Sequence, residues 1–235
     1  ATRIHYVTTY GGAAPNVVPD FAEVYYYVRH PEADQVRELF DRVIEAAAGA
    51  ALGTETQMEY EVINGVYNLL PNVTLAEIIH ANLTAVGGVE YTEDEMRFAR
   101  VVRQSLPEDA RPLESAAQVK PFELLLGARS GGGSTDVGDV SWNVPTAGLR
   151  TATWVPGTSS HSWQAVAAGG TSIGTKGMLV AAKTIARSAV DLFQQPDLIR
   201  RARAEFEERR GADYSYISLV GDRPPPLDYR SNPGG

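Results

Sequence analysis

The hydrophobic pattern at the start of the chain changes from a period of two to a helical period and back again. Two β-prone runs come first, Ile4–Tyr10 and Val17–Arg29, and a glycine pair closes the first of them. An amphipathic helix then runs from Pro31 to about Gly53, because apolar residues recur there every three to four positions. The alternation over Thr54–Ile63 predicts a further, half-exposed strand. This order predicts a small α+β module in which a helix packs on one face of an antiparallel sheet.

After Pro71 the pattern becomes mainly helical. Helices are predicted over Leu75–Val86, over Thr92–Leu106 behind a capping box, from Thr171 or Ser172 to about Phe193, and from Pro196 onward. Leu149–Val155 predicts a short strand, and residues 107–130 are irregular. We therefore expect an α/β fold in two parts, residues 1–72 and residues 73–235, with an extended tail over residues 222–235.

Composition and charge exclude several functions. The chain has 43% hydrophobic and 21% charged residues, as folded globular proteins do. A formal net charge of −8 argues against nucleic acid as a partner, because phosphate binding requires clustered Lys and Arg. No segment resembles a membrane span, so we expect a cytoplasmic protein with no membrane partner. Cysteine is absent, which leaves histidine and carboxylates as the candidate metal ligands.

The four histidines are the complete set of candidate imidazole ligands. His5 lies in the first predicted strand, His80 in a helix and His30 at a helix start, where structural roles are the simplest interpretation. His161 differs because it follows the predicted strand Leu149–Val155, in a loop of small residues. Loops at strand ends are where α/β proteins place functional groups. Position alone leaves a functional and a structural His161 equally open, and one histidine cannot specify a metal site.

A second candidate segment, residues 131–140, combines glycines with hydroxyl and carboxylate side chains. Its candidate substrate-binding residues are Ser134, Thr135, Asp136 and Asp139. Glycines allow a backbone to approach a ligand closely. No Gly-Lys-Ser/Thr follows, so the segment is not a phosphate-binding P-loop. The alternative is a flexible loop that leads to a helix capped by Ser134 or Asp136.

A third candidate lies between the first two predicted strands and at the end of the second. Asn16 offers an amide donor before the strand, and Arg29 offers a guanidinium at its end that could clamp a carboxylate. A bend followed by a strand ending in a solvated arginine explains the same residues. Taken by themselves, the residues favour that simpler interpretation.

Several motifs along the chain follow one another in a particular order. Gly-Gly-Ala-Ala-Pro-Asn-Val-Val-Pro-Asp comes first, with Glu-Val-Tyr-Tyr-Tyr-Val-Arg shortly after it. Gly-Ser-Thr-Asp-Val-Gly-Asp-Val-Ser-Trp, Gly-Thr-Ser-Ser-His-Ser-Trp-Gln and Gly-Thr-Ser-Ile-Gly-Thr-Lys-Gly-Met follow. Together they resemble the aminoacylase/carboxypeptidase family of dinuclear zinc amidohydrolases. The last three are similar to its p-aminobenzoyl-glutamate hydrolase branch, and the similarity runs from about Arg3 to about Phe193.

The resemblance implies a lid (dimerisation) domain over residues 1–72 and the C-terminal half of a zinc-peptidase-like α/β catalytic domain over residues 73–235. In that family His161 matches the last metal ligand. Asn16 and Arg29 match lid residues that hold the substrate's carboxylate, commonly across a homodimer interface. The segment from Ser134 to Asp139 matches a loop at the edge of the metal pocket. The implied cofactor is a pair of divalent metal ions, zinc, with manganese or cobalt as alternatives.

The resemblance also places the other metal ligands and the catalytic base in a half that precedes the lid. The 235 residues of this sequence contain no counterpart of that half. The chain begins in strand-like sequence without an initiator methionine or a signal peptide, as expected if an upstream segment has been removed. We therefore expect no catalytic base here, and expect a second polypeptide or a missing segment to supply it.

The implied reaction is hydrolysis of the amide bond of an N-acyl or N-aroyl amino acid, such as an aroyl-glutamate. On this interpretation the chain is part of a metal-dependent enzyme and is inactive alone. A non-catalytic dimerisation or regulatory subunit of the same fold is the alternative. A nucleotide-binding α/β protein is disfavoured, because neither a lysine nor a dinucleotide fingerprint accompanies the glycine-rich segment.

Overall fold

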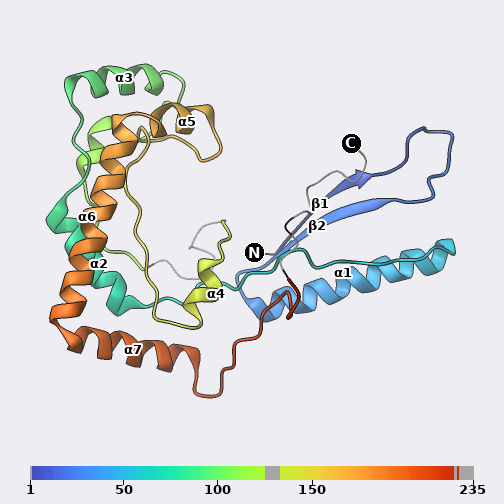
Figure 1. Cartoon of the computed structure of the whole chain (residues 1–235). Coiled ribbons are helices and arrows are strands. Elements are labelled where there is room, and N and C mark those ends of the chain that lie inside the picture. The colour runs from blue at the N-terminus through green and yellow to red at the C-terminus, as the bar shows by residue number, and fades with distance from the viewer. Residues whose placement is uncertain (1, 125–132, 225–226, 228–235) are drawn as a thin grey trace. The chain divides into compact units, whose positions relative to one another are not determined.

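A computed structural model of the chain describes residues 2–124, 133–224 and 227, and these form two compact units (Figure 1). The first unit comprises the described residues within Ala1–Leu69, Leu125–Trp142 and Ser215–Gly235. The second comprises Leu70–Leu124 and Asn143–Tyr214. The first break lies beside the expected boundary at residue 72, and the later segments return to the first unit. The domains expected over residues 1–72 and 73–235 stay a prediction.

Two antiparallel strands form the sheet of the first unit, β1 (Arg3–Tyr10) and β2 (Glu23–Arg29). The register pairs Arg3 with Arg29, and every residue of β1 is exposed. Aromatic and β-branched side chains suit such a pleated, exposed ladder, where cross-strand neighbours contact one another. Helix α1 (Ala33–Thr54) packs against β2, and the short helix α4 (Val137–Ser141) belongs to the same unit. The predicted α+β module is confirmed in this coarse form.

The strand predictions over Thr54–Ile63 and Leu149–Val155 are wrong, and the strand predicted from Val17 begins only at Glu23. A strand requires a neighbour that takes up its backbone hydrogen bonds. Among the described residues, β1 and β2 are the strands that pair. The chain after α1 instead runs back beside that helix (Figure 1), with the Tyr60 and Phe40 ring centroids 6.0 Å apart. The alternating segment after α1 therefore packs on that helix and does not pair with a strand.

The second unit is helical. Its elements are α2 (Val73–Val86), α3 (Glu93–Arg103), the 3-10 helix η1 (Leu113–Ala117), α5 (Trp163–Gly169), α6 (Ser172–Gln194) and α7 (Pro196–Arg210). Helix α6 packs along α2, and both contact α7 (Figure 1). The buried core cluster is Ala99, Val102, Leu113, Val155, Ala168 and Ile173. This core joins α3, η1, α5 and α6 to the chain that leads to His161.

Local capping signals determine where these helices begin. Thr92 and Glu95 form the predicted capping box of α3, and the Thr171 hydroxyl accepts from the Ile173 amide at the start of α6. Pro196 opens α7. These three predictions are confirmed. They could be made from the sequence because a cap depends on residues only a few positions apart.

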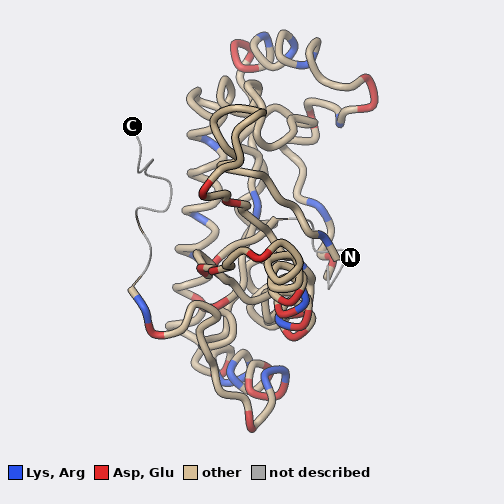
Figure 2. Tube along the Cα trace, turned by 90° about the vertical axis from the view of Figure 1, so that its right-hand side faces the viewer, with Lys and Arg blue, Asp and Glu red and all other residues tan. Residues whose placement is uncertain are grey.

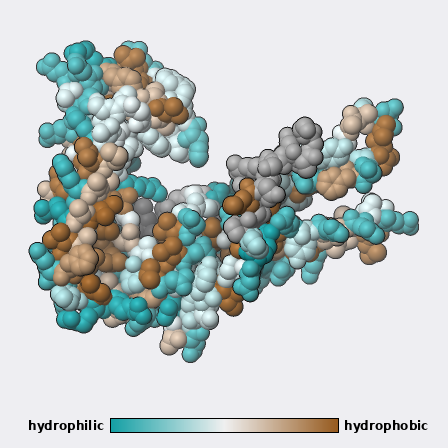
Figure 3. All heavy atoms as spheres, in the orientation of Figure 1, coloured by the Kyte–Doolittle hydropathy of each residue, from teal (hydrophilic) through white to brown (hydrophobic). Residues whose placement is uncertain are grey.

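Surface composition agrees with a folded, mixed-charge chain. Figure 2 shows acidic and basic residues interspersed along the helices. Hydrophobic side chains are also visible at the surface of the molecule (Figure 3). None of the helices in the described ranges has the length and apolar character that crossing a membrane requires. The cytoplasmic location, like the lid and catalytic-half assignments, stays a prediction. The mixture of helices and a small sheet is compatible with the expected α/β class.

Candidate functional site

The loop that carries His161 is anchored at both ends. Val155 lies in the core at its start, and Gly157, with φ +95°, lies against Ala110. A β-carbon on Gly157 would come within 2.4 Å of the Ala110 side chain, so a larger residue does not fit. At the far end, the Ser162 hydroxyl accepts from the Ala165 amide and caps α5. His161 is therefore the residue immediately before a helix cap.

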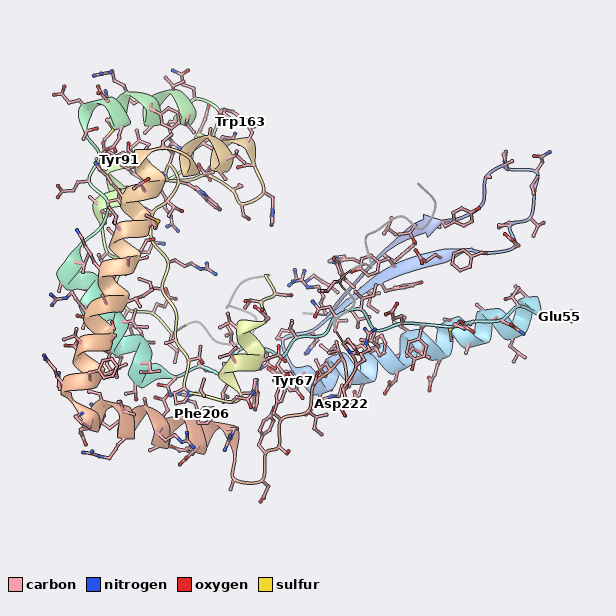
Figure 4. All side chains as sticks on the ribbon, viewed as in Figure 1. Glu55, Tyr67, Tyr91, Trp163, Phe206 and Asp222 are labelled. Atoms are coloured by element: carbon pink, nitrogen blue, oxygen red, sulfur yellow. The ribbon has the colours of Figure 1, made fainter. Side chains whose placement is uncertain are left out.

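His161 adopts a left-handed backbone conformation, with φ +59°. Few residues other than glycine adopt this conformation, and histidine is among those enriched in it. The side chain is exposed and lines an open pocket of about 430 Å³. The other lining residues are Trp154, Ser162, Trp163, Ala165 and Val166. Figure 4 labels Trp163 at the start of α5. The structure therefore places the candidate metal ligand at an aromatic-lined surface hollow.

The described residues do not make a metal site around His161. A catalytic zinc ion normally has three protein ligands. In the described parts of the chain, no group of three or more His, Asp or Glu side chains is arranged to hold a metal ion. His161 offers one imidazole, so a metal at this position requires ligands from elsewhere. The expected pair of divalent metal ions stays a prediction.

Arg29 and Ser134 come together although they are 105 positions apart. The Arg29 guanidinium, at the end of β2, donates to the Ser134 hydroxyl oxygen over 2.7 Å. Arg29 is half-buried and Ser134 is exposed. The hydroxyl retains its own proton as a donor, so the pair offers an anion a cationic donor and a neutral one. Two of the predicted substrate-binding residues thus form one local group.

Asn16 lies away from this group. The Val17 amide donates to the Ala14 carbonyl at 3.2 Å, which makes Asn16 the third residue of a turn with proline second. That turn lies in the connection between β1 and β2, whereas Arg29 ends β2 at the opposite end of the ladder. The strand between spans roughly 20 Å at the usual rise per residue. The structure does not bring Asn16 and Arg29 together within one chain.

Asp139 holds its own unit together. Its carboxylate accepts from the Tyr67 amide at 3.3 Å and from the Tyr216 hydroxyl at 2.9 Å. Burial and this contact with Asp139 raise the pKa of Tyr216. The Tyr67 hydroxyl in turn donates to the Ile217 carbonyl. These contacts explain Asp139 as an anchor between α4 and two distant segments, while a role in substrate binding stays a prediction.

Thr135 and Asp136 lie at the start of α4. Asp136 occupies the N-cap position without a side-chain cap bond, and the Thr135 hydroxyl accepts from the Val137 amide. Both side chains are exposed. The interpretation of this segment as a helix start is therefore confirmed, with a different residue acting as the acceptor. Their predicted contacts with substrate stay untested, and Gly131 and Gly132 lie outside the described residues.

Several glycines of the motifs allow close approach between backbones. A β-carbon on Gly138 would lie 1.9 Å from the Tyr67 carbonyl oxygen. One on Gly174 would lie 2.2 Å from the Gly169 carbonyl oxygen, and one on Gly177 would lie 2.5 Å from that of Ala152. Real β-carbons do not come this close. These motif positions therefore allow close backbone packing within their own units.

Trp154 and Trp163 are the lining residues that sequence reasoning missed. They flank His161 in the same motif, and the available signal was the presence of two large aromatic residues in a loop of small ones. Trp163 is 63% exposed and Trp154 is 36% exposed. Exposed indoles are expensive to leave in water, and they gather at binding surfaces.

Comparison with known proteins finds similarity to hydrolases. The chain is 36% identical over 230 residues to a subunit of the p-aminobenzoyl-glutamate hydrolase of Escherichia coli (strain K12), covering 88% of this chain and 47% of that protein. It is 28% identical over 208 residues to the Xaa-Arg dipeptidase of Mus musculus, and 26% identical over 207 residues to that of Homo sapiens. In each dipeptidase the match covers 87% of this chain and 40% of the relative.

The chain is a homologue of these hydrolases, and the resemblance found in the motifs is confirmed. Among them it is similar in particular to the p-aminobenzoyl-glutamate hydrolase subunit. The chain spans less than half the length of the curated relatives it matches. No family model matches the chain.

Proposed function

We propose that the chain is part of a metal-dependent amidohydrolase that cleaves the amide bond of an N-acyl or N-aroyl amino acid, such as an aroyl-glutamate. One observation carries the proposal, the 36% identity to an aroyl-glutamate hydrolase subunit over 88% of the chain. The exposed position of His161 on an open pocket is compatible with it. In the proposal His161 is one metal ligand. The remaining ligands and the general base come from polypeptide outside these 235 residues, as a preceding segment or a second chain.

The proposal assigns the substrate's free carboxylate to Arg29 and Ser134. A guanidinium donates to a carboxylate with strong, charge-assisted bonds, and the serine hydroxyl adds a second donor. The Arg29–Ser134 contact of 2.7 Å supports this pairing, because it brings both donors to one place before substrate binds. Thr135, Asp136 and Asp139 would then support the position of Ser134, with Asp139 acting through its contacts to Tyr67 and Tyr216.

Asn16 can share that carboxylate only if it comes from a second copy, because it and Arg29 lie at opposite ends of the ladder. We therefore propose a homodimer formed through the lid, residues 1–72. The full exposure of β1 supports this proposal. A mixed dimer of Asn16→Ala and Arg29→Ala chains tests it. One intact carboxylate site per dimer predicts about half of the activity, whereas either homodimer of variants loses most of it.

The test of the metal ligand uses the chain assembled with the polypeptide that supplies the other half of its relatives. His161→Ala should abolish hydrolysis of p-aminobenzoyl-glutamate and lower the metal content measured by mass spectrometry. His80→Ala is the matched control, because His80 lies in α2, outside the proposed dimer region and outside the pocket that His161 lines. Unchanged activity and metal content in His161→Ala would sink the ligand assignment. An assembled protein that binds partners but hydrolyses no amide would favour the non-catalytic dimerisation or regulatory subunit.

The test of the carboxylate clamp compares Arg29→Ala with Arg3→Ala. The two arginines are directly opposite one another in the ladder, so the control removes the same charge from the same end of the sheet. Arg29→Ala should raise KM, or lower kcat/KM, by about tenfold or more for a substrate with a free carboxylate. A neutral amide analogue should be far less affected. An equal loss on both substrates, or an equal loss in Arg3→Ala, contradicts the clamp.

A further inference from the structure

The pocket beside His161, here named the indole pocket, is formed by Trp154, His161, Ser162, Trp163, Ala165 and Val166. Apart from His161, none of these lining side chains is ionisable. The Ser162 hydroxyl is engaged, because it donates to the Ser159 carbonyl at 2.7 Å and accepts from the Ala165 amide. The surface that remains for a ligand is therefore two indole rings, one imidazole and small apolar side chains.

The volume of the indole pocket suits a small ring. At about 430 Å³ it lies within the ~300–1,000 Å³ of ordinary small-molecule sites. A dry apolar cavity of about 150 Å³ already holds benzene. An aromatic ring with a substituent therefore fits, and the open mouth leaves room for the rest of a longer molecule.

The chemistry of the lining favours a flat aromatic ligand over an aliphatic one. Indole rings pair with other π systems in offset-stacked or edge-to-face arrangements, which add to the energy of area burial. Trp163 offers much of its ring to solvent, and Trp154 offers part of its ring in the same hollow. The adjacent His161 places any group attached to the ring next to the candidate metal ligand.

We propose that the indole pocket binds the aromatic acyl group of the substrate, and that Trp154 and Trp163 make the enzyme specific for aroyl over aliphatic acyl amides. The assignment deepens the proposed function and rests on it for the identity of the substrate. The lining residues all belong to this chain, so we expect the ring to bind without a metal ion or a second polypeptide. It can therefore be measured separately from hydrolysis.

The experiment titrates the 235-residue chain with benzamide, a neutral aromatic acyl amide, and follows tryptophan fluorescence. Cyclohexanecarboxamide, its non-aromatic counterpart, is the matched probe. We expect saturable binding of benzamide that is at least about fivefold tighter than binding of the cyclohexane compound. Trp163→Leu and Trp154→Leu should each weaken benzamide binding by about fivefold or more, and Trp163→Phe should restore part of it.

Trp142→Phe is the control variant. Trp142 lies in the first unit, where its indole donates to the Asn68 carbonyl of the same unit. It does not line the indole pocket. Circular dichroism checks that each variant is folded. Because Trp163 is largely exposed, its substitution should disturb the fold little. Equal affinity for the two probes, or benzamide binding that survives both leucine variants, overturns the proposal.

The outcomes also separate this inference from the proposed function. Ring-dependent binding to the chain, together with no amide hydrolysis by the assembled enzyme, supports the indole pocket and contradicts the proposed function. Hydrolysis that depends on His161 but proceeds equally on aroyl and aliphatic acyl glutamates supports the proposed function and overturns the specificity role of Trp154 and Trp163.

Discussion

Glu205 of α7 holds the N-terminus of α2 and is the sharpest place to test the packing of the second unit. Its carboxylate accepts from the Val73 amide at 2.7 Å, from the Thr74 amide at 2.8 Å and from the Thr74 hydroxyl at 2.7 Å. Arg209 donates to the same carboxylate at 2.8 Å. The first amides of a helix have no partner within the helix, so a carboxylate there satisfies two of them and favours the helix dipole.

The pKa of Glu205 measures how strongly this environment favours the ionised carboxylate. Burial raises the pKa, but the bonds from Thr74, Val73 and Arg209 outweigh burial and lower it from 4.5 to about 2. At 1.36 kcal/mol per pKa unit this corresponds to about 3 kcal/mol of stabilisation. The side chain is only 17% exposed, so solvent screens little of this free energy. Glu205→Gln keeps the shape but cannot accept at both oxygens, and should lower the free energy of unfolding by about 2–3 kcal/mol.

The assay is urea unfolding followed by far-ultraviolet circular dichroism. Near neutral pH, Glu205→Gln should move the midpoint down by roughly 1 M. Glu207→Gln is the matched control on the same helix. The Glu207 side chain is 53% exposed, so its ion pair with Arg203 should contribute no more than about 0.5 kcal/mol.

The lowered pKa of Glu205 also predicts how the stability difference between the wild type and Glu205→Gln changes with pH. A lowered pKa stabilises the fold fully above pH 4.5, and this stabilisation disappears as pH falls toward about 2. The difference between the wild type and Glu205→Gln should shrink over that range. Equal effects of the two glutamine variants, or a deficit that does not shrink in acid, would refute the reasoning.

Two further predictions use the same denaturation measurements. Glu95 is only 8% exposed and its carboxylate pairs with Lys176 at 2.6 Å, so Glu95→Gln should lower the free energy of unfolding by about 1–3 kcal/mol. Burial raises the pKa of Glu95, but hydrogen bonds led by that from Lys176 outweigh burial and lower the pKa to about 2. The stability lost in Glu95→Gln should therefore also shrink as pH falls toward about 2. A loss of stability that does not change with pH would contradict this prediction. Gly138→Ala forces a β-carbon onto the Tyr67 carbonyl oxygen and should cost about 1–3 kcal/mol, measured by thermal denaturation. Gly148→Ala, with no atom within 4 Å of the added carbon, should be close to neutral, and equal losses at the two glycines would contradict the packing argument.

The sequence by itself predicts the features that depend on neighbouring residues. The capping box at Thr92, the threonine cap of α6 and the proline start of α7 all form as expected. Each depends on side chains and amides within one helical turn, so no distant partner is needed. The motifs around Asn16, Arg29 and His161 likewise identified the family, because a run of adjacent residues can carry a family resemblance without knowledge of the fold.

The strands show where local reasoning ends. Thr54–Ile63 and Leu149–Val155 have the composition of strands but lack a paired neighbour in the described part of the chain. A strand is stabilised by hydrogen bonds to another segment, and the position of that segment is not a local property. An alternating pattern therefore indicates that one side of a segment is buried. It does not indicate whether a strand or a helix covers that side.

Only the tertiary structure decided which candidate site residues meet. It brought Arg29 to Ser134 across 105 positions and kept Asn16 at the far end of the ladder. It also showed Trp154 and Trp163 in one pocket with His161. Residue type and spacing determine what chemistry a side chain can perform and which helix it begins or caps. Which side chains share a pocket depends on long-range packing, because contacts between distant segments are set by the whole fold.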